Sequence, residues 1–433
     1  MKRLLFIAIL FCGTITYAQE QKLKKADALF EEMAYADAAK AYEAYLKDAK
    51  KPGITTTKRI ADTYFYTNNF AKAADWYEKV LKMPGASTDE VHYRRYVLSL
   101  RALKRYDEAD ALVGQKLASK KIKKDLERFK KQKNQLDSIT RITSKFEIRN
   151  VEEINSPLTE FGTTFFGSKI IYSSAKDTTK FGGKTYKYNN QPYLELYIAD
   201  VDSNGRFTNE KKFAKRDQIS YHNSNVAFLP GNDSIVYFSA NILKGGGRLN
   251  KNDAGTNNIG IFKAKLKEGR MRDIEPMLFN NVNYSCAHPA ISADGKWMYF
   301  TSDMPGGEGE ADIYVAAILE NGMTDKPKNL GPTINTEGKE MFPFIHENVL
   351  YFSSDWHYGL GGLDVFESKI DDKGNYGEPE NLGKPVNSNR DDFAYIVAEN
   401  KLSGYFSSNR AGGKGDDDIY YFKKNVGRPL RES

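Results

Sequence analysis

One phrase occurs three times in the second half of this 433-residue chain and constrains its fold more than any other feature. It begins with Phe-Ser-Ser or a close variant at Phe300, Phe352 and Phe406, passes through a glycine-rich loop and ends at an Asp that always lies ten residues after the second Ser. Copies 52 and 54 residues apart have room for four short strands each. Because such a unit cannot bury its own faces, it must stack on further copies. The repeat therefore predicts a β-propeller.

Two weaker copies, around Tyr172 and Phe238, precede these three, so the expected propeller has five blades, with six as the alternative. The last copy ends near Lys424 and lacks a fourth strand, whereas residues 145–151 form an alternating strand that belongs to no copy. Pairing the two would close the ring and remove its exposed edges. We expect the propeller to occupy residues 145–424, followed by a short tail over 425–433.

The first 18 residues have the pattern of an export signal. A basic start precedes a short apolar run, and the small residues before Gln19 suit cleavage after Ala18. Cleavage would remove Cys12 and leave Cys286 alone, so no intrachain disulfide is expected. No later stretch approaches the roughly 20 apolar residues of a membrane span. These residues predict an exported chain without a membrane span.

Residues 19–140 have a helical period and a second repeat. Tyr35, Phe70 and Tyr106 each open an alanine-rich helix and are separated by 35 and 36 residues. These segments resemble tetratricopeptide repeats, whose period is about 34 residues and which pair two helices per repeat. The resemblance implies an α-helical solenoid in front of the propeller.

A strongly basic helix is expected to cap this solenoid. It could bind an anionic partner, although a terminal repeat also needs a polar outer face. The formal net charge of +7 falls to +5 when Lys2 and Arg3 leave with the signal, which is too small to indicate nucleic acid. The candidate basic residues of this helix are Lys120, Lys121, Lys124 and Arg128.

The search for chemistry is mostly negative. The five histidines occur singly, and the chain has no zinc-protease, serine-hydrolase or phosphate-loop motif. The segment 200–205 matches the opening of a calcium loop, but Lys211 stands where a glutamate is required. The sequence therefore predicts no enzyme activity, no cofactor and no metal. The repeated Asp312, Asp364 and Asp418 are expected to accept hydrogen bonds from amides of the glycine loops.

The complete set of phrases resembles the WD40-like (TolB-type) propeller repeats of exported bacterial proteins. Tetratricopeptide repeats followed by such a propeller are similar to the OmpA-family periplasmic proteins of the Bacteroidota, which include the peptidoglycan-anchoring component of the type IX secretion and gliding machinery. The resemblance implies a periplasmic, outer-membrane-associated protein. It departs from the family after the propeller, because no residue here matches the OmpA-like domain, so direct peptidoglycan binding is not implied.

On this basis we expect a non-enzymatic scaffold that binds other envelope proteins, plausibly in a secretion or gliding complex. One alternative is a module that binds a small ligand, a peptide or a glycan. A second alternative is a propeller hydrolase with a site at the channel mouth, which would need converging carboxylates or histidines.

Partner binding is predicted at two inserts after the second strands of blades one and two. Each is about ten residues longer than the matching loops of the other blades, and extra length on one face of a repeat scaffold favours a binding surface. Together they would form one basic, aromatic ridge; a pair of solvated loops is the other interpretation. The candidate residues are Lys176, Lys180, Lys184, Tyr186, Lys187, Tyr188, Lys244, Arg248 and Lys251.

Overall fold

The structure, a computed structural model, describes residues 18–48, 51–84, 90–119, 123–141, 145–178, 185–214 and 221–425. The chain divides into two compact units. One comprises Met1–Val113 together with Lys184–Gln191, and the other comprises Gly114–Gly183 and Pro192–Ser433. Residues 1–17 of the predicted export signal lie outside the described residues. No helix in the described part of the chain is both long enough and apolar enough to cross a bilayer.

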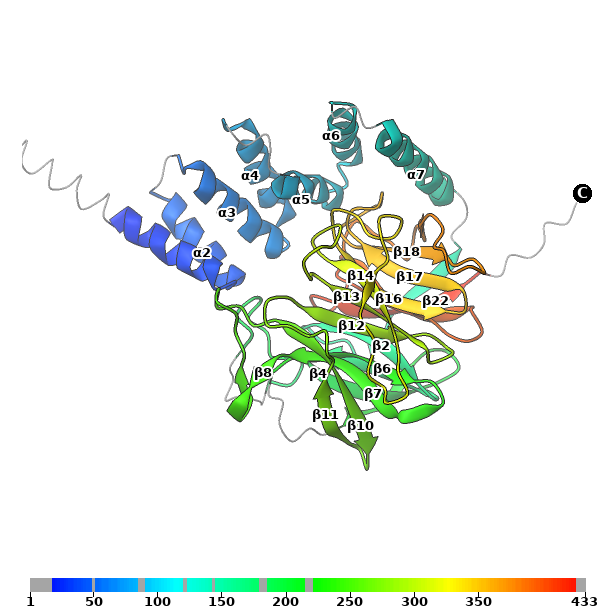
Figure 1. The fold of residues 1–433 in the computed structure, drawn as a ribbon. Helices are drawn as coiled ribbons and strands as arrows, with labels where there is room; N and C mark the ends of the chain where they lie inside the picture. The colour runs from blue at the N-terminus through cyan, green and yellow to red at the C-terminus, as the bar shows by residue number, and fades with distance from the viewer. Residues whose placement is uncertain are drawn as a thin grey trace, which may run out of the picture. The chain divides into compact units, whose positions relative to one another are not determined.

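The first unit is built from consecutive helices (Figure 1). They run over 18–31, α2 (Tyr35–Leu46), α3 (Ile54–Tyr66), α4 (Phe70–Lys82), α5 (Glu90–Ala102) and the beginning of α6 (Tyr106–Ser119). The three aromatic residues predicted to open helices are the first residues of α2, α4 and α6. Small buried residues such as Ala38 and Ala73 leave room for the neighbouring helix to pack closely.

A buried polar contact repeats along these helices with the period of the sequence. Tyr42 donates to Asp27 at 2.7 Å, and Tyr77, 35 residues later, donates to Asp62 at 2.7 Å. Each aspartate also pairs with an arginine two helices further along the chain. Asp27 pairs with Arg59 of α3 at 3.1 Å, and Asp62 of α3 pairs with Arg95 of α5 at 2.8 Å. The recurrence shows that successive helix pairs are copies of one packing unit.

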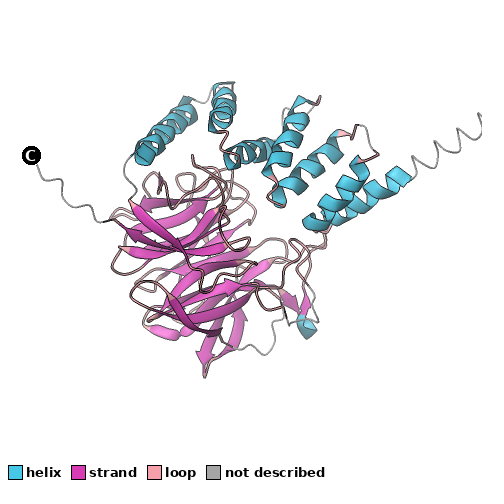
Figure 2. Ribbon diagram, turned by 180° about the vertical axis from the view of Figure 1, so that it is seen from behind, coloured by secondary structure: helices cyan, strands magenta, loops and turns pink. Residues whose placement is uncertain are grey.

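The second unit contains a five-bladed propeller of four-stranded antiparallel sheets, which confirms the predicted fold and blade count over the six-bladed alternative (Figures 1 and 2). Blade one contains β2 (Glu160–Phe166), β3 (Lys169–Ser174), β4 (Glu195–Val201) and β5 (Phe207–Lys212). Blade two contains β6 (Asn223–Leu229), β7 (Asn232–Asn241), β10 (Ile259–Lys267) and β11 (Arg270–Pro276), with the ribbon β8 (Leu243–Lys244) and β9 (Arg248–Leu249) in its long loop.

Blades three to five follow the same order. Blade three contains β12 (Cys286–Ile291), β13 (Trp297–Ser302), β14 (Asp312–Ala317) and β15 (Lys328–Asn329). Blade four contains β16 (Glu340–His346), β17 (Val349–Ser354), β18 (Asp364–Lys369) and β19 (Glu380–Asn381). Blade five contains β20 (Asp392–Val397), β21 (Ser403–Ser408), β22 (Asp418–Lys424) and, from the front of the propeller, β1 (Phe146–Asn150).

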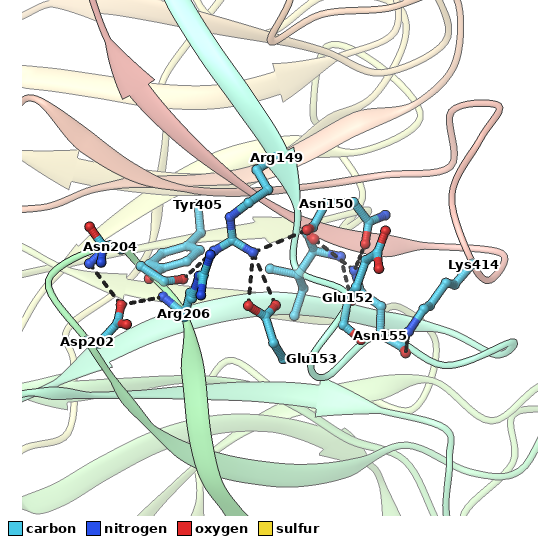
Figure 3. A network of polar contacts seen from close by, with 12 residues as sticks. Arg149, Asn150, Glu152, Glu153, Asn155, Asp202, Asn204, Arg206, Tyr405 and Lys414 are labelled. Atoms are coloured by element: carbon cyan, nitrogen blue, oxygen red, sulfur yellow. Dashed lines mark hydrogen bonds and ion pairs between the residues drawn. The ribbon is translucent and has the colours of Figure 1, made fainter.

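Strand β1 closes the ring as predicted. It pairs antiparallel with β22, with Ile148 opposite Phe422. Figure 3 shows Arg149 on this strand, whose guanidinium donates to the carboxylate of Glu153 at 3.1 Å and also to the carbonyl of Gly205 at 2.8 Å. Gly205 belongs to the hairpin between β4 and β5, so Arg149 ties the closing strand of blade five to blade one.

The Phe-Ser-Ser phrase acts both inside and between blades. Phe300, Phe352 and Phe406 are fully buried. The first serine of the pair contacts the next blade, since the Oγ of Ser239 accepts the amide of His288 at 3.0 Å. The same contact from Ser407 reaches the amide of Gly162 at 3.3 Å and thus joins blade five to blade one. The repeat therefore encodes the ring as well as the blade.

The repeated aspartates accept hydrogen bonds within the glycine loops. Asp312 accepts the amides of Glu308 and Gly309 at 2.6 and 3.1 Å, together with the side-chain amide of Asn329 at 2.7 Å. Asp364 accepts the side-chain amide of Asn381 at 3.1 Å.

In the last blade, Asp418 accepts the amides of Lys414 and Gly415 at 2.5 and 3.0 Å. The side-chain amide that donates to Asp418 is that of Asn150 on β1, at 2.6 Å. The closing strand therefore supplies the missing Asn of the fifth copy.

Helix α7 (Lys123–Arg141) groups with the propeller and not with the helical block to which it was assigned as a cap. Its apolar residues explain this placement, because the ring of Phe129 meets that of Tyr358 at 5.3 Å and Leu136 packs against Tyr358 and Leu360. Arg128 donates to the carbonyl of Thr333 at 3.3 Å. At least one basic side chain of the helix therefore makes a contact within the propeller unit.

A buried histidine beside this helix predicts an acid-sensitive fold. His357 is buried, and its Nε2 lies 2.8 Å from the carbonyl of Ile334. Burial lowers the pKa of His357 from 6.5 to about 4. Below pH 6.5 the imidazole therefore becomes protonated in the unfolded chain, whereas in the folded chain it stays neutral down to about pH 4. The contribution of neutral His357 to the free energy of unfolding is complete above pH 6.5 and is lost as the pH falls. At pH 5 the loss is about 2 kcal/mol.

The test is His357→Gln, whose amide can still donate to Ile334. We expect the fall in Tm between pH 7.5 and pH 5.0 to be smaller in this variant than in the wild type. Part of the fall should remain, because burial also lowers the pKa values of His222 and His288. Equal falls in both proteins would contradict the assignment.

Candidate functional site

The five inner strands of the propeller line a central channel, and each carries the same irregularity. The register of every inner strand shifts at a residue with positive φ, which is Gly162, Asn225, His288, Phe342 or Ala394 from blade one to blade five. A β-bulge at one level of every blade places one different residue per blade around the channel. The five blades thus provide five equivalent positions that carry different side chains.

Between these strands lies a cavity of about 200 Å³. The rings of His288 and Phe342 stack in its wall with centroids 3.7 Å apart, and burial lowers the pKa of His288 to about 3, so this imidazole is neutral. Hydrolysis of a glycosidic bond normally uses two carboxyl groups on either side of the bond. None of the residues that line this cavity is acidic.

A larger cleft of about 880 Å³ lies between blades three and four. Trp297, the first residue of β13, lines it and is 44% exposed. Two tyrosines from different blades also line it, and the hydroxyl of Tyr376 donates to that of Tyr299 at 3.2 Å. Both tyrosines also pack in the core cluster with Ile345, so part of the lining of the cleft is aromatic and packed against the core.

Acidic and amide side chains complete the cleft. Hydrogen bonds from Ser292, Lys401 and Asn375 lower the pKa values of Asp294, Glu347 and Asp371, respectively. These three carboxylates are therefore ionised acceptors at neutral pH. The lining residues of this kind are Asp294, Glu347, Asn348, Asp371, Asp372 and Asn375, with Lys328 as the one cation among the lining residues.

Sequence reasoning did not find this cleft. The available signal was Trp297, a large aromatic residue directly after the hairpin turn Asp294-Gly295-Lys296. It stands at the solvent end of a strand whose next three residues are buried. A catalytic motif does not include such a residue, because part of the lining of the cleft, including Tyr376, comes from another blade.

The predicted partner-binding residues fall into different places. Lys180 and Lys184, with Lys120 and Lys121 of the basic helix, lie outside the described residues, and the side chain of Lys124 is also not described. Lys176 approaches the ring of Tyr197 at 4.5 Å and pairs with Glu210.

The first insert is divided between the two compact units, and Lys176 lies in the propeller unit. Tyr186, Lys187 and Tyr188 group with the helices, whereas Lys244, Arg248 and Lys251 lie in the propeller unit, the first two on the ribbon β8–β9. The single ridge expected from the sequence remains a prediction.

The acidic segment at 200–205 forms a hairpin turn. The carboxylate of Asp202 accepts the amides of Asn204 and Arg206 at 2.8 and 2.9 Å (Figure 3). Within the described part of the chain, no group of three or more His, Cys, Asp or Glu side chains is placed to hold a metal ion.

No protein-family model and no curated protein matches the chain. Solved structures with a similar fold include an endo-arabinase from Bacteroides thetaiotaomicron, with 10% identity and a TM-score of 0.41 over 65% of this chain and 97% of that one. An alpha-L-arabinofuranosidase from Lactobacillus brevis has 11% identity and a TM-score of 0.39 over 65% and 98%. A puromycin-hydrolyzing peptidase from Mycobacterium tuberculosis has 13% identity and a TM-score of 0.34 over 58% of this chain and 43% of its own length. This chain thus spans less than half of that peptidase.

The prediction that the chain is not an enzyme relied on missing sequence motifs. It is withdrawn, because proteins named as hydrolases are among those with a similar fold. At these identities the likeness shows the fold alone and assigns no catalytic residue to this chain.

Proposed function

We propose that this protein is a glycan-binding propeller and that the cleft between blades three and four holds a neutral oligosaccharide. The main observation for this proposal is that the exposed indole of Trp297 lines one cleft together with Tyr299 and Tyr376. A sugar ring has an apolar C–H face and a polar rim. An exposed indole suits the first, and clustered carboxylates and amides suit the second.

The charge of the cleft narrows the ligand class. The four carboxylates of the lining outnumber its one lysine, although Lys296 and Lys401 pair with Asp294 and Glu347 and offset two of them. A neutral sugar can donate its hydroxyls to these ionised carboxylates. A basic peptide is the other ligand that suits this charge. Its binding would fall steeply with salt, and that of a neutral glycan would not.

The experiment is calorimetric titration of the full chain with arabino-, xylo- and gluco-oligosaccharides at low and high salt. We expect one of these to bind with little dependence on salt, and Trp297→Ala to weaken its binding by about tenfold or more, as loss of a buried aromatic anchor does. The matched control is Leu319→Ala, which removes an equally exposed apolar side chain of the same blade outside the cleft. Equal binding by wild type and Trp297→Ala would refute the assignment. Release of reducing ends during the same titrations would extend binding to hydrolysis.

This cleft gives no support to the envelope-scaffold function expected from the family resemblance. Tetratricopeptide identity, periplasmic location and membership of a secretion or gliding complex remain predictions. Fractionation of the native envelope with an antibody against the chain would test the location.

A further inference from the structure

Residues 185–191, part of the long insert of blade one, pack on the helices of the first unit. Tyr188 lies edge-on to Tyr35, with ring centroids 5.1 Å apart and planes at 90°, and within 6.2 Å of Tyr66. The Nζ of Lys187 pairs with Glu32 at 2.7 Å. The segment thus presents an aromatic ring and a cation to complementary groups on the helices.

The helical side of this contact is preorganised. Tyr35 and Tyr66 stack with centroids 4.4 Å apart, although they come from α2 and α3. The guanidinium of Arg95 lies 4.9 Å from the ring of Tyr66, and Asp62 holds Arg95 at 2.8 Å. The repeating Asp–Arg contact of the helices therefore also fixes the aromatic floor of this surface.

The bound segment is itself a tight turn. The amide of Tyr186 donates to the carbonyl of Gln191 at 2.7 Å, and the amide of Asn190 donates back to the carbonyl of Tyr186 at 2.8 Å. The rings of Tyr186 and Tyr188 stack with their planes only 7° apart. Lys187 lies between these two tyrosines in the sequence of the turn.

The polar contacts of this segment contribute little energy. Lys187 and Glu32 have side chains 68% and 56% exposed, and ion pairs at this exposure contribute little to stability. The side chain of Asn190 reaches Asp37 at the long distance of 3.4 Å. A segment held in this way can be displaced by a ligand of the same chemistry.

We propose that the surface of Glu32, Tyr35 and Tyr66 is a recognition site for a Tyr-Lys-Tyr turn of a partner protein, and that residues 185–191 occupy it in the isolated chain. Partner binding then requires release of the internal turn, which acts as a competitor at a high effective concentration. This proposal is independent of the glycan cleft.

The test uses the full chain and an open variant in which residues 186–190 are replaced by glycine and serine. The probe is a fluorescein-labelled peptide of residues 185–192, closed by a disulfide between cysteines added at its ends, and binding is followed by fluorescence anisotropy. We expect the open variant to bind the peptide at least ten times more tightly than the wild type. An open variant that melts like the wild type and binds no peptide would overturn the proposal. If the open variant is less stable than the wild type, Tyr188→Ala replaces it, with the same two outcomes.

A charge exchange separates recognition from a merely structural contact. In the open variant, Glu32→Lys should abolish binding of the peptide, and a peptide carrying Lys187→Glu should restore it. Glu20→Lys, the same change at an exposed position within the first helix, is the matched control and should leave binding unchanged. Binding that ignores the sign at position 32 would refute the site. A wild-type dimer that excess peptide converts to monomer would also refute occupancy within one chain.

Discussion

Replacing residues 145–151 with a glycine-serine linker of equal length should abolish cooperative unfolding of the propeller and cause the chain to aggregate. The replacement removes β1, and with it every backbone hydrogen bond that β22 makes on its outer side. An unpaired strand edge is a template for association with other chains. The replacement also removes Asn150, which Asp418 needs as its side-chain donor, and Arg149, which ties blade five to blade one.

The matched control replaces residues 243–249, the ribbon β8–β9, with the same seven-residue linker. This ribbon pairs only with itself in the described structure, so its loss should shift Tm by a few degrees at most. Calorimetry and light scattering on both variants distinguish the outcomes. If the variant without β1 stays monomeric and melts like the control, the ring does not depend on β1.

Tyr77→Ala should cost the helical unit about 3–5 kcal/mol, the range for removing a large buried ring. Tyr77 is fully buried on α4, and its hydroxyl donates to buried Asp62. Phe70, which opens the same helix, is only half-buried, so Phe70→Ala should cost less.

Urea unfolding followed by circular dichroism at the helical minimum measures both changes. Tyr77→Phe keeps the ring and removes only the donor to Asp62, so it should cost about 1–3 kcal/mol. A Tyr77→Ala chain as stable as Phe70→Ala would show that this tyrosine is not the packing centre of its repeat.

The sequence was sufficient for the propeller because its information is local and repeated. Phe300, Phe352 and Phe406 mark the second strand of three blades, and the constant spacing to Asp312, Asp364 and Asp418 reflects hydrogen bonds that close within one loop. Ring closure was also predictable, because a spare strand and a missing strand can be counted without coordinates.

The placement of α7 and of the first insert depended on packing that the sequence does not show. The basic residues of α7 suggested a solvated cap, but Phe129 and Leu136 found an apolar partner in Tyr358, more than 200 residues away. Tyr186 and Tyr188 suggested a surface that projects to solvent, whereas Tyr188 packs on stacked Tyr35 and Tyr66. Amphipathic segments can bury their apolar face on any complementary surface.

What the sequence by itself determined is therefore the repeating unit, its number and the pairing that closes it, since these follow from periodicity and from contacts short in sequence. The tertiary structure alone decided which non-repeated residues of different repeats or segments contact one another. Trp297 and Tyr376 come from different blades and share one cleft, and Glu32 meets Lys187 from 155 residues away. Their function arises where the repeats differ, and such differences have no periodic signature.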